Sequence, residues 1–298
     1  MSSTVTSGGE KVPRGKVRAG RPSAVWALPA VLFFTFFAVV PMALAFYLSF
    51  TEWDGLGDPK PVGLANWQKL LDDPRLTQSL SLTLLLMAAS WVFQTVVSLL
   101  LGVWAAGRQR NRAILSAIFF VPFLLSSTAI ALLFYALLDP NFGVIRANIL
   151  GSSSGAFFAI VFVGAWQFIP FHTLIYQGGA RQIPEVLYQA AAIDGAGRYR
   201  QFFSITLPQL RHTITTSTVL MVVGLLTYFE TVLILTKGGP GTDTAILPYL
   251  MYEAGFKSYD FGYASTIASS LVVAATGLSL LLVRLTGFGR MRSTREGM

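Results

Sequence analysis

Six long apolar runs, separated by polar segments, dominate the pattern of this 298-residue chain. Each run is close to the about 20 mostly apolar residues that a helix needs to cross the hydrocarbon core of a bilayer. Strict alternation, the mark of a membrane barrel strand, is absent, and backbone groups in lipid must be paired within the segment. The sequence therefore predicts six spanning helices: Ala24–Phe50, Leu80–Ala106, Ala113–Leu138, Ala156–Gln177, Ile214–Thr236 and Tyr263–Val283.

The first run follows several Lys and Arg residues, as the apolar core of a signal peptide would. It contains Ala43-Leu44-Ala45, which resembles a cleavage site, but it continues past these residues to Phe50. The apolar core of a signal peptide is only about 7–15 residues long. We therefore interpret the run as an uncleaved span.

The distribution of basic residues predicts the orientation of the spans. Sixteen of the 22 Lys and Arg residues fall in the two terminal segments and in the segments that follow the second and fourth spans; six fall on the other side. Basic residues concentrate on the cytoplasmic side of membrane proteins. Both termini and the segment 183–208 are therefore predicted to be cytoplasmic.

These predictions divide the chain into a basic cytoplasmic tail over 1–23, expected to be disordered, a first span over 24–50, an external loop over 51–79, a core over 80–286 and a cytoplasmic tail over 287–298. The composition agrees, because only 12% of the residues are charged and 53% are hydrophobic, whereas soluble domains have about 25% charged residues. The basic residues adjoin apolar runs and form no separate basic domain, so nucleic acid is not an expected partner.

The sequence offers little catalytic chemistry. It contains no G-x-x-x-x-G-K-[ST] phosphate loop and no cysteine. Gly151–Gly155 matches the pattern G-x-S-x-G, but it lies in a Ser/Gly connector rather than at a strand-to-helix turn. His172 and His212 stand alone, without carboxylates at ligand spacing. We expect no catalytic residues and no metal site.

The segment Ile183–Pro208 reads as two short helices that form a cytoplasmic elbow. Pro184 suits the first position of a helix, and Glu185 is favourable near a helix N-terminus. Apolar residues then recur at helical spacing until Asp194-Gly195 interrupts the pattern, a second helix is expected from Arg198 to Ile205, and Pro208 is expected to end it. The apolar face is mostly alanine, which favours close approach of a protein over burial in lipid headgroups.

This segment resembles the EAA loop of permease subunits of binding-protein-dependent ABC importers. The matching residues are Glu185, Gln189-Ala190-Ala191, Asp194-Gly195-Ala196, Phe202-Phe203 and Leu207-Pro208, with Gln189 where the motif has glutamate. Three further stretches resemble the carbohydrate-uptake branch, with its maltose-type first permease subunit: Val62–Trp67, Leu235–Pro240, and Tyr252–Phe256 leading to Tyr259–Ala264. The resemblance covers about residues 24 to 287, in order.

The resemblance implies an all-α integral membrane fold of six transmembrane helices, a type I ABC importer permease. It also implies a multi-pass location in a bacterial or archaeal cytoplasmic (inner) membrane. It implies two cytoplasmic ATPase subunits that use ATP and Mg, a second permease subunit and an extracytoplasmic sugar-binding protein, with no cofactor bound by this chain. The ATPase-coupling residues would be Glu185, Leu187, Gln189, Ala190, Ala191, Asp194, Gly195 and Ala196. The substrate path would include Phe123, Gln167, Phe168, Phe171, Leu225 and Tyr228.

Several alternatives stay open on the sequence. Aromatic residues in spans also serve as ordinary packing. Glu230, the one acidic residue inside a predicted span, either contacts substrate or faces a protein interior or water-filled cavity. The imported solute could be a sugar, a glycerol phosphate or a polyamine. An ion-coupled secondary carrier is a further alternative, and a membrane-embedded enzyme has no supporting residues.

Overall fold

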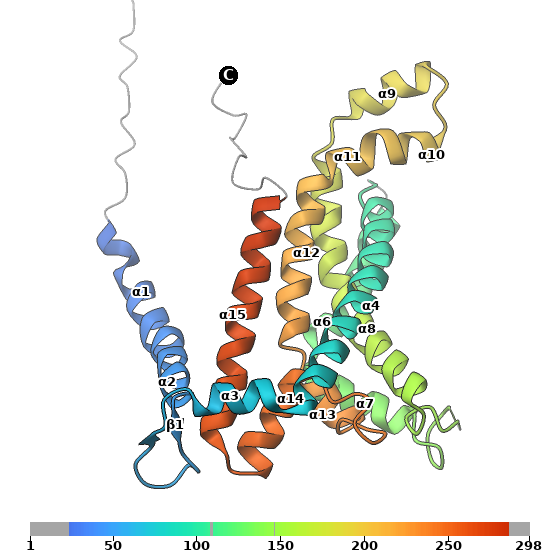
Figure 1. The fold of residues 1–298 in the computed structure, drawn as a ribbon. Helices are drawn as coiled ribbons and strands as arrows, with labels where there is room; N and C mark the ends of the chain where they lie inside the picture. Colours follow the sequence, from blue (N-terminus) through green and yellow to red (C-terminus); the bar gives the residue numbers. More distant parts are fainter. Residues whose placement is uncertain (1–23, 108–109, 146, 286–298) are drawn as a thin grey trace, which may run out of the picture. The chain divides into compact units, whose positions relative to one another are not determined.

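The computed structural model describes residues 24–107, 110–145 and 147–285. The tails predicted over 1–23 and 287–298 lie outside these residues. The chain divides into two compact units, 1–43 and 44–298, and each is described by itself. Figure 1 shows the elements of the second unit, in which helices predominate.

The first apolar run forms one helical stretch, Val25–Leu48, long and apolar enough to cross a membrane. It comprises η1 (Ala24–Ala27), α1 (Leu28–Phe34), the π-helical turn η2 (Thr35–Val39) and α2 (Val40–Leu48). Pro41 accounts for the wide turn, because proline has no N–H and its ring clashes with the carbonyl four residues earlier. The backbone widens just before it, so that the N–H of Val40 donates to the carbonyl of Thr35.

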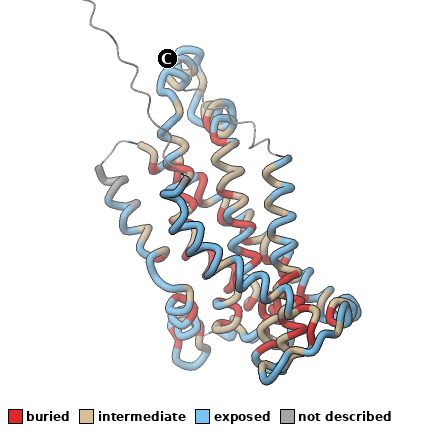
Figure 2. The backbone as a smooth tube through the Cα atoms, turned by 90° about the vertical axis from the view of Figure 1, so that its left-hand side faces the viewer, coloured by how far each residue is buried: buried red, intermediate tan, exposed pale blue. Residues whose placement is uncertain are grey.

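Four long helices form the bundle of the second unit: α4 (Pro74–Ala105), α8 (Ser153–Arg181), α12 (Arg211–Leu226) and α15 (Phe261–Leu285). Helix α8 packs along α4, and α12 contacts α4, α8 and α15. Helix α8 is central, since 61% of its most apolar window is buried against 17% for α15. Figure 2 shows exposed residues along the outer faces of the long helices, and most of these faces are apolar, as a lipid environment requires.

The third predicted run differs from a straight span. It consists of α5 (Arg110–Phe119), α6 (Val121–Leu124) and α7 (Ser127–Leu137), and the chain bends by 98° between Ala117–Leu124 and Ser127–Leu137. Ser126 begins α7 by accepting a hydrogen bond from the N–H of Ala129 at 3.1 Å. Within residues 24–107, 110–145 and 147–285, four helices are therefore continuous candidates for spans, and this bent pair would be a fifth.

The fifth predicted run is also broken. Helix α12 ends at Leu226, and α13 (Glu230–Leu235) begins after a three-residue interruption. The hydroxyl of Thr227 donates to the carbonyls of Val223 and Gly224, at 3.3 Å and 3.1 Å. Irregular backbone at membrane depth is tolerated where protein buries it or where it lines a cavity, and Tyr228 in this break does line a cavity.

The predicted external loops are short and ordered. Strand β1 (Thr51–Glu52) pairs antiparallel with β2 (Lys60–Pro61), with Thr51 opposite Pro61, and α3 (Ala65–Asp72) follows. Asn66 ties this loop to the end of the first helical stretch, because its Nδ2 donates to the carbonyls of Ser49 and Thr51 at 3.1 Å and 2.8 Å. Helix α14 (Leu247–Tyr252) and the π-helical turn η4 (Glu253–Lys257) lie beside α15.

Asp73 connects the start of α4 to Tyr263 of α15. It caps α4 by accepting a hydrogen bond from the N–H of Arg75 at 2.9 Å, and it also accepts one from the Tyr263 hydroxyl at 2.8 Å. Burial raises the pKa of Asp73, but the hydrogen bonds from Arg75 and Tyr263 outweigh it, so the pKa lies below its usual value.

We expect Asp73→Ala to lower the free energy of unfolding by about 1 kcal/mol, the usual cost of losing an N-cap. Since the folded-state pKa is lowered, this stabilisation is present above the pKa of the unfolded chain and is lost as the pH falls through the folded value. Thermal unfolding in detergent at neutral and acidic pH measures this difference. Exposed Asp72 is the matched control, and an equal loss in Asp72→Ala would contradict the role of Asp73.

Candidate solute cavity and coupling segment

A cavity of about 280 Å³ lies among α4, α6, α8 and α12. It brings together five of the six residues that the resemblance placed in the substrate path: Phe123, Phe168, Phe171, Leu225 and Tyr228. Phe123 lies on α6, Phe168 and Phe171 on α8, Leu225 near the end of α12 and Tyr228 in the break that follows. The bend after α6 and the break after α12 both adjoin this cavity.

Aromatic rings form one continuous wall of the cavity. The Phe123 and Phe171 rings stack with centroids 5.0 Å apart and an interplanar angle of 14°. Phe168 meets Phe123 edge-on at 6.2 Å and Tyr228 edge-on at 6.4 Å. Such offset and edge-on arrangements are favourable for aromatic pairs, so the wall is a preformed surface that a flat apolar face of a solute can contact.

Gly164 provides the space that the Tyr228 side chain occupies. A Cβ atom at Gly164 would lie 2.7 Å from the Tyr228 hydroxyl oxygen and 3.0 Å from Cζ. Tyr228 is buried, so its ring has little room to move away. The absence of a side chain at Gly164 therefore sets the position of one aromatic residue of the wall.

Gln94 of α4 adds a polar group that was not predicted from the sequence. This residue is 2% exposed and lines the cavity, and its Nε2 has no hydrogen-bond partner within the described part of the chain. Burying an N–H donor without an acceptor costs free energy, and a ligand hydroxyl would accept this hydrogen bond. A signal was available, because α4 carries buried polar residues mostly four positions apart: Ser79, Thr83, Ser90, Gln94 and Ser98.

His172 is a second cavity residue that was not placed there from the sequence. Its Nδ1 lies 2.9 Å from the Ser217 hydroxyl, within the contact of α8 with α12. Gly164, Leu220, Met221 and Gly224 complete the lining.

The sixth of these residues, Gln167, and the separate candidate for substrate contact, Glu230, lie elsewhere. Gln167 is buried beside the bend of the third run, where its Nε2 donates to the Ser127 hydroxyl at 3.1 Å and the Leu125 carbonyl at 3.4 Å. These hydrogen bonds satisfy polar groups at the irregular backbone of the bend, so the Gln167 amide does not serve the cavity. Glu230 is exposed at the first position of α13 and is not among the lining residues.

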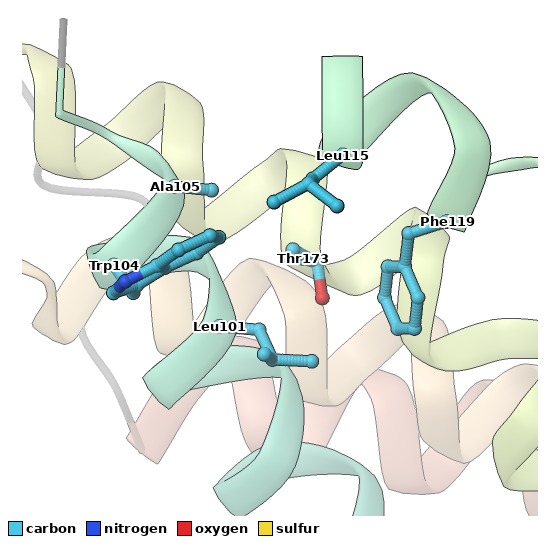
Figure 3. A pocket seen from close by; sticks show the side chains of 6 residues that line it. All are labelled: Leu101, Trp104, Ala105, Leu115, Phe119 and Thr173. Carbon is cyan, nitrogen blue, oxygen red and sulfur yellow. The ribbon is translucent and has the colours of Figure 1, made fainter. Parts of the chain in front are cut away.

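A separate apolar cavity of about 240 Å³ lies between α4, α5 and α8. Figure 3 shows its side chains: Leu101, Trp104, Ala105, Leu115, Phe119 and Thr173. Among the described lining residues, Thr173 contributes the one hydroxyl, so these residues provide few groups for a hydrated solute.

The predicted coupling segment forms an elbow of short helices. Helix α9 (Glu185–Ile193) follows Pro184, and the chain turns at Gly195, whose φ of +75° lies in the left-handed region. The N–H groups of Gly195 and Ala196 donate to the carbonyls of Ala192 and Ala191 at 3.1 Å and 2.8 Å, which closes the end of the helix. The expected helix and its Asp-Gly break are thus present.

The second half of the elbow differs from the prediction at Pro208. Helix α10 (Arg198–Gln201) continues through the π-helical turn η3 (Phe202–Thr206) into α11 (Leu207–Gln209), so Pro208 does not end the helix. The wide turn directly precedes this proline, as η2 precedes Pro41, and it removes the need for the N–H that proline lacks.

Helix α9 presents its predicted coupling residues on the surface. It contains no buried residue, and Val186 and Ile193 are 63% and 87% exposed. Glu185, Leu187, Gln189, Ala190, Asp194 and Gly195 are exposed, and Ala191 and Ala196 are intermediate. Figure 1 shows α9, α10 and α11 at one end of the bundle, away from α3 and α14.

These features define a multi-pass membrane protein with broken spans around a central cavity. The family model described as "Binding-protein-dependent transport system inner membrane component" matches residues 98–288. The chain belongs to this family, so the resemblance to permease subunits of binding-protein-dependent importers is confirmed.

Relatives and solved structures agree. The chain is 30% identical to the probable ABC transporter permease protein YurN of Bacillus subtilis, over 89% of this chain and 96% of the relative. It is 30% identical to the multiple sugar-binding transport system permease protein MsmF of Streptococcus mutans, over 87% and 92%. Its fold matches a chain of a bacterial alginate ABC transporter with a TM-score of 0.75, 21% identity and coverage of 88% and 92%.

Proposed function

We propose that this chain is the permease subunit of an ATP-driven importer for a di- or oligosaccharide. The observation that carries the proposal is the cavity between broken spans, with its aromatic wall and the donor of Gln94. Sugar rings have apolar C–H faces and polar rims, which suit an aromatic surface with a few hydrogen-bonding groups. Relatives such as the multiple sugar-binding permease of S. mutans support this class of solute.

In this proposal the elbow 183–208 transmits force from two cytoplasmic ATPase subunits, which use ATP and Mg. The exposed apolar residues of α9 support a docking role, since a contiguous apolar surface on a helix is favourable when a partner covers it. A second permease subunit would complete the path, and an extracytoplasmic binding protein would deliver the solute to the short loops that include α3 and α14. Both termini would be cytoplasmic, as the basic residues predict.

The test is reconstitution in liposomes. We expect the chain alone to show no ATP hydrolysis above background and no uptake of labelled maltose, trehalose, glycerol 3-phosphate or spermidine. Addition of the second permease, the ATPase and the binding protein should produce ATP-dependent uptake of a sugar.

Three outcomes would contradict the proposal. Uptake by the chain alone, driven by a proton or sodium gradient and lost in Glu230→Gln, would indicate a secondary carrier. ATP hydrolysis by the chain alone would assign it an activity of its own. ATP-dependent uptake of spermidine or glycerol 3-phosphate, with no uptake of sugar, would keep the importer and reject the solute class.

A further inference from the structure

A third cavity, of about 330 Å³, lies where the elbow meets the bundle. Val103 and Ala106 line it from the end of α4, Ala180 lines it from the end of α8, and Phe202 lines it from the elbow. The candidate spans of α4 and α8 end at Ala105 and Arg181. The cavity therefore lies at the ends of these two candidate spans, on the side that the basic residues predict to be cytoplasmic.

The remaining lining residues are polar and come from the elbow: Tyr188, Arg198, Gln201 and Thr206. The Tyr188 and Thr206 hydroxyls lie 2.9 Å apart, and the Nε2 of Gln201 donates to the carbonyl of Ala196 at 2.9 Å. One side of the cavity is thus apolar and continuous with the spans, while the other carries hydroxyl, amide and guanidinium groups. This division fits an amphiphile.

Arg198 indicates that the expected ligand carries a negative charge. No acidic residue lines the cavity, and among the ion pairs within the described part of the chain none includes Arg198. A guanidinium presents several N–H donors in a planar fork that matches a phosphate group. Basic pockets between spanning helices on the cytoplasmic side suit anionic lipid headgroups.

We infer that this cavity binds the phosphate headgroup of an anionic membrane lipid. Arg198 contacts the phosphate, the Tyr188 and Thr206 hydroxyls border the headgroup, and Val103, Ala106 and Ala180 contact the start of the acyl chains. Because the cavity joins the elbow to the ends of α4 and α8, an occupied cavity couples the position of the elbow to the lipid around the protein. This inference goes beyond the proposed transport function and depends only on the predicted orientation.

The experiment measures lipid retained by the purified full-length chain in native mass spectrometry. The chain is titrated with phosphatidylglycerol, with phosphatidylcholine, or with inorganic phosphate. We expect retention of phosphatidylglycerol in preference to phosphatidylcholine and no retention of inorganic phosphate. Arg198→Gln should weaken phosphatidylglycerol binding about tenfold, the effect of losing one strong charge-assisted contact.

Arg200→Gln is the matched control, because Arg200 lies on the same short helix, carries the same charge and does not line the cavity. It should bind phosphatidylglycerol as the unmodified chain does. A second variant, Ala106→Leu, should also lose the lipid, since it fills the apolar side without changing charge. Gel filtration and thermal unfolding verify that each variant is folded.

Three results would overturn the inference. Equal weakening by Arg198→Gln and Arg200→Gln would indicate general attraction of the basic surface for anionic lipid. Unchanged binding in both Arg198→Gln and Ala106→Leu would place the lipid elsewhere. Retention of inorganic phosphate that is lost in Arg198→Gln, without preference for phosphatidylglycerol, would identify a free anion as the ligand.

Discussion

Replacement of Gly195 by valine is expected to lower ATP-driven uptake by about tenfold or more and to weaken association with the ATPase subunits. Gly195 ends α9 with a φ of +75°, a conformation that costs an L-residue about 1–2 kcal/mol and a β-branched residue more. A change of about 1.4 kcal/mol corresponds to a tenfold change in an equilibrium. Valine therefore shifts the elbow from its bent conformation, and α9 loses its orientation for docking.

Gly197→Val is the matched control for this prediction. A Cβ atom meets nothing within 4 Å at either glycine, so added volume is the same at both positions. Gly197 has a φ of −68° and a ψ of 169°, which valine adopts readily. Gly195→Asn should retain more activity than Gly195→Val, because asparagine tolerates the left-handed region. Co-purification with the ATPase and uptake into liposomes provide the readouts, and equal effects of the two valine variants would refute the argument from backbone conformation.

Gly164→Ala is expected to reduce uptake by about tenfold while the assembled complex remains intact. The new Cβ would lie 2.7 Å from the Tyr228 hydroxyl, so either the ring or α8 must shift and the cavity wall is distorted. Overpacking of a closely packed site costs about 1–3 kcal/mol. The reconstituted complex, assayed for KM and maximal rate of uptake with its binding protein, measures the effect.

Two further variants separate this clash from a general effect of cavity volume. Gly224→Ala also adds a methyl group to the lining of the cavity, but no atom lies within 4 Å of its Cβ, so uptake should change little. Tyr228→Phe removes the oxygen that meets the Cβ, so the double variant Gly164→Ala/Tyr228→Phe should recover uptake relative to Gly164→Ala. Strictly additive losses in the double variant would show that Gly164 acts by another route.

The predicted spans show how far periodicity and length determine a membrane fold. Four runs form continuous helices, because a long apolar run in lipid must pair its backbone groups internally. The bend at Leu125-Ser126 could not be predicted in this way, since Gln167, about 40 residues later, pairs with the irregular backbone. Ser126 is a local N-cap signal for α7, but the local sequence does not show that a distant amide will pair with the irregular backbone at the bend.

The sequence likewise predicted only part of the candidate site. The resemblance placed Phe123, Phe168, Phe171, Leu225 and Tyr228 in one path, and the structure brings these five side chains together. It placed Gln167 with them, and the sequence left substrate contact as one alternative for Glu230, whereas Gln167 supports a bend and Glu230 is exposed. Gln94 was missed because it lies on the first core span, which the resemblance did not assign to the path.

By itself the sequence determined the apolar runs and, through the basic residues, the predicted orientation of the chain in the membrane. It also determined the short helix that Pro184 and Asp194-Gly195 delimit. These features depend on local composition and backbone preference. Only the tertiary structure decided where the third and fifth runs break, which polar side chains enter the cavity and how Pro208 is accommodated without ending a helix. The breaks and the polar side chains in the cavity depend on packing and hydrogen bonding between segments far apart in the chain. The accommodation of Pro208 depends on a local widening of the helix. Neither cause produces a pattern of fixed spacing in the sequence.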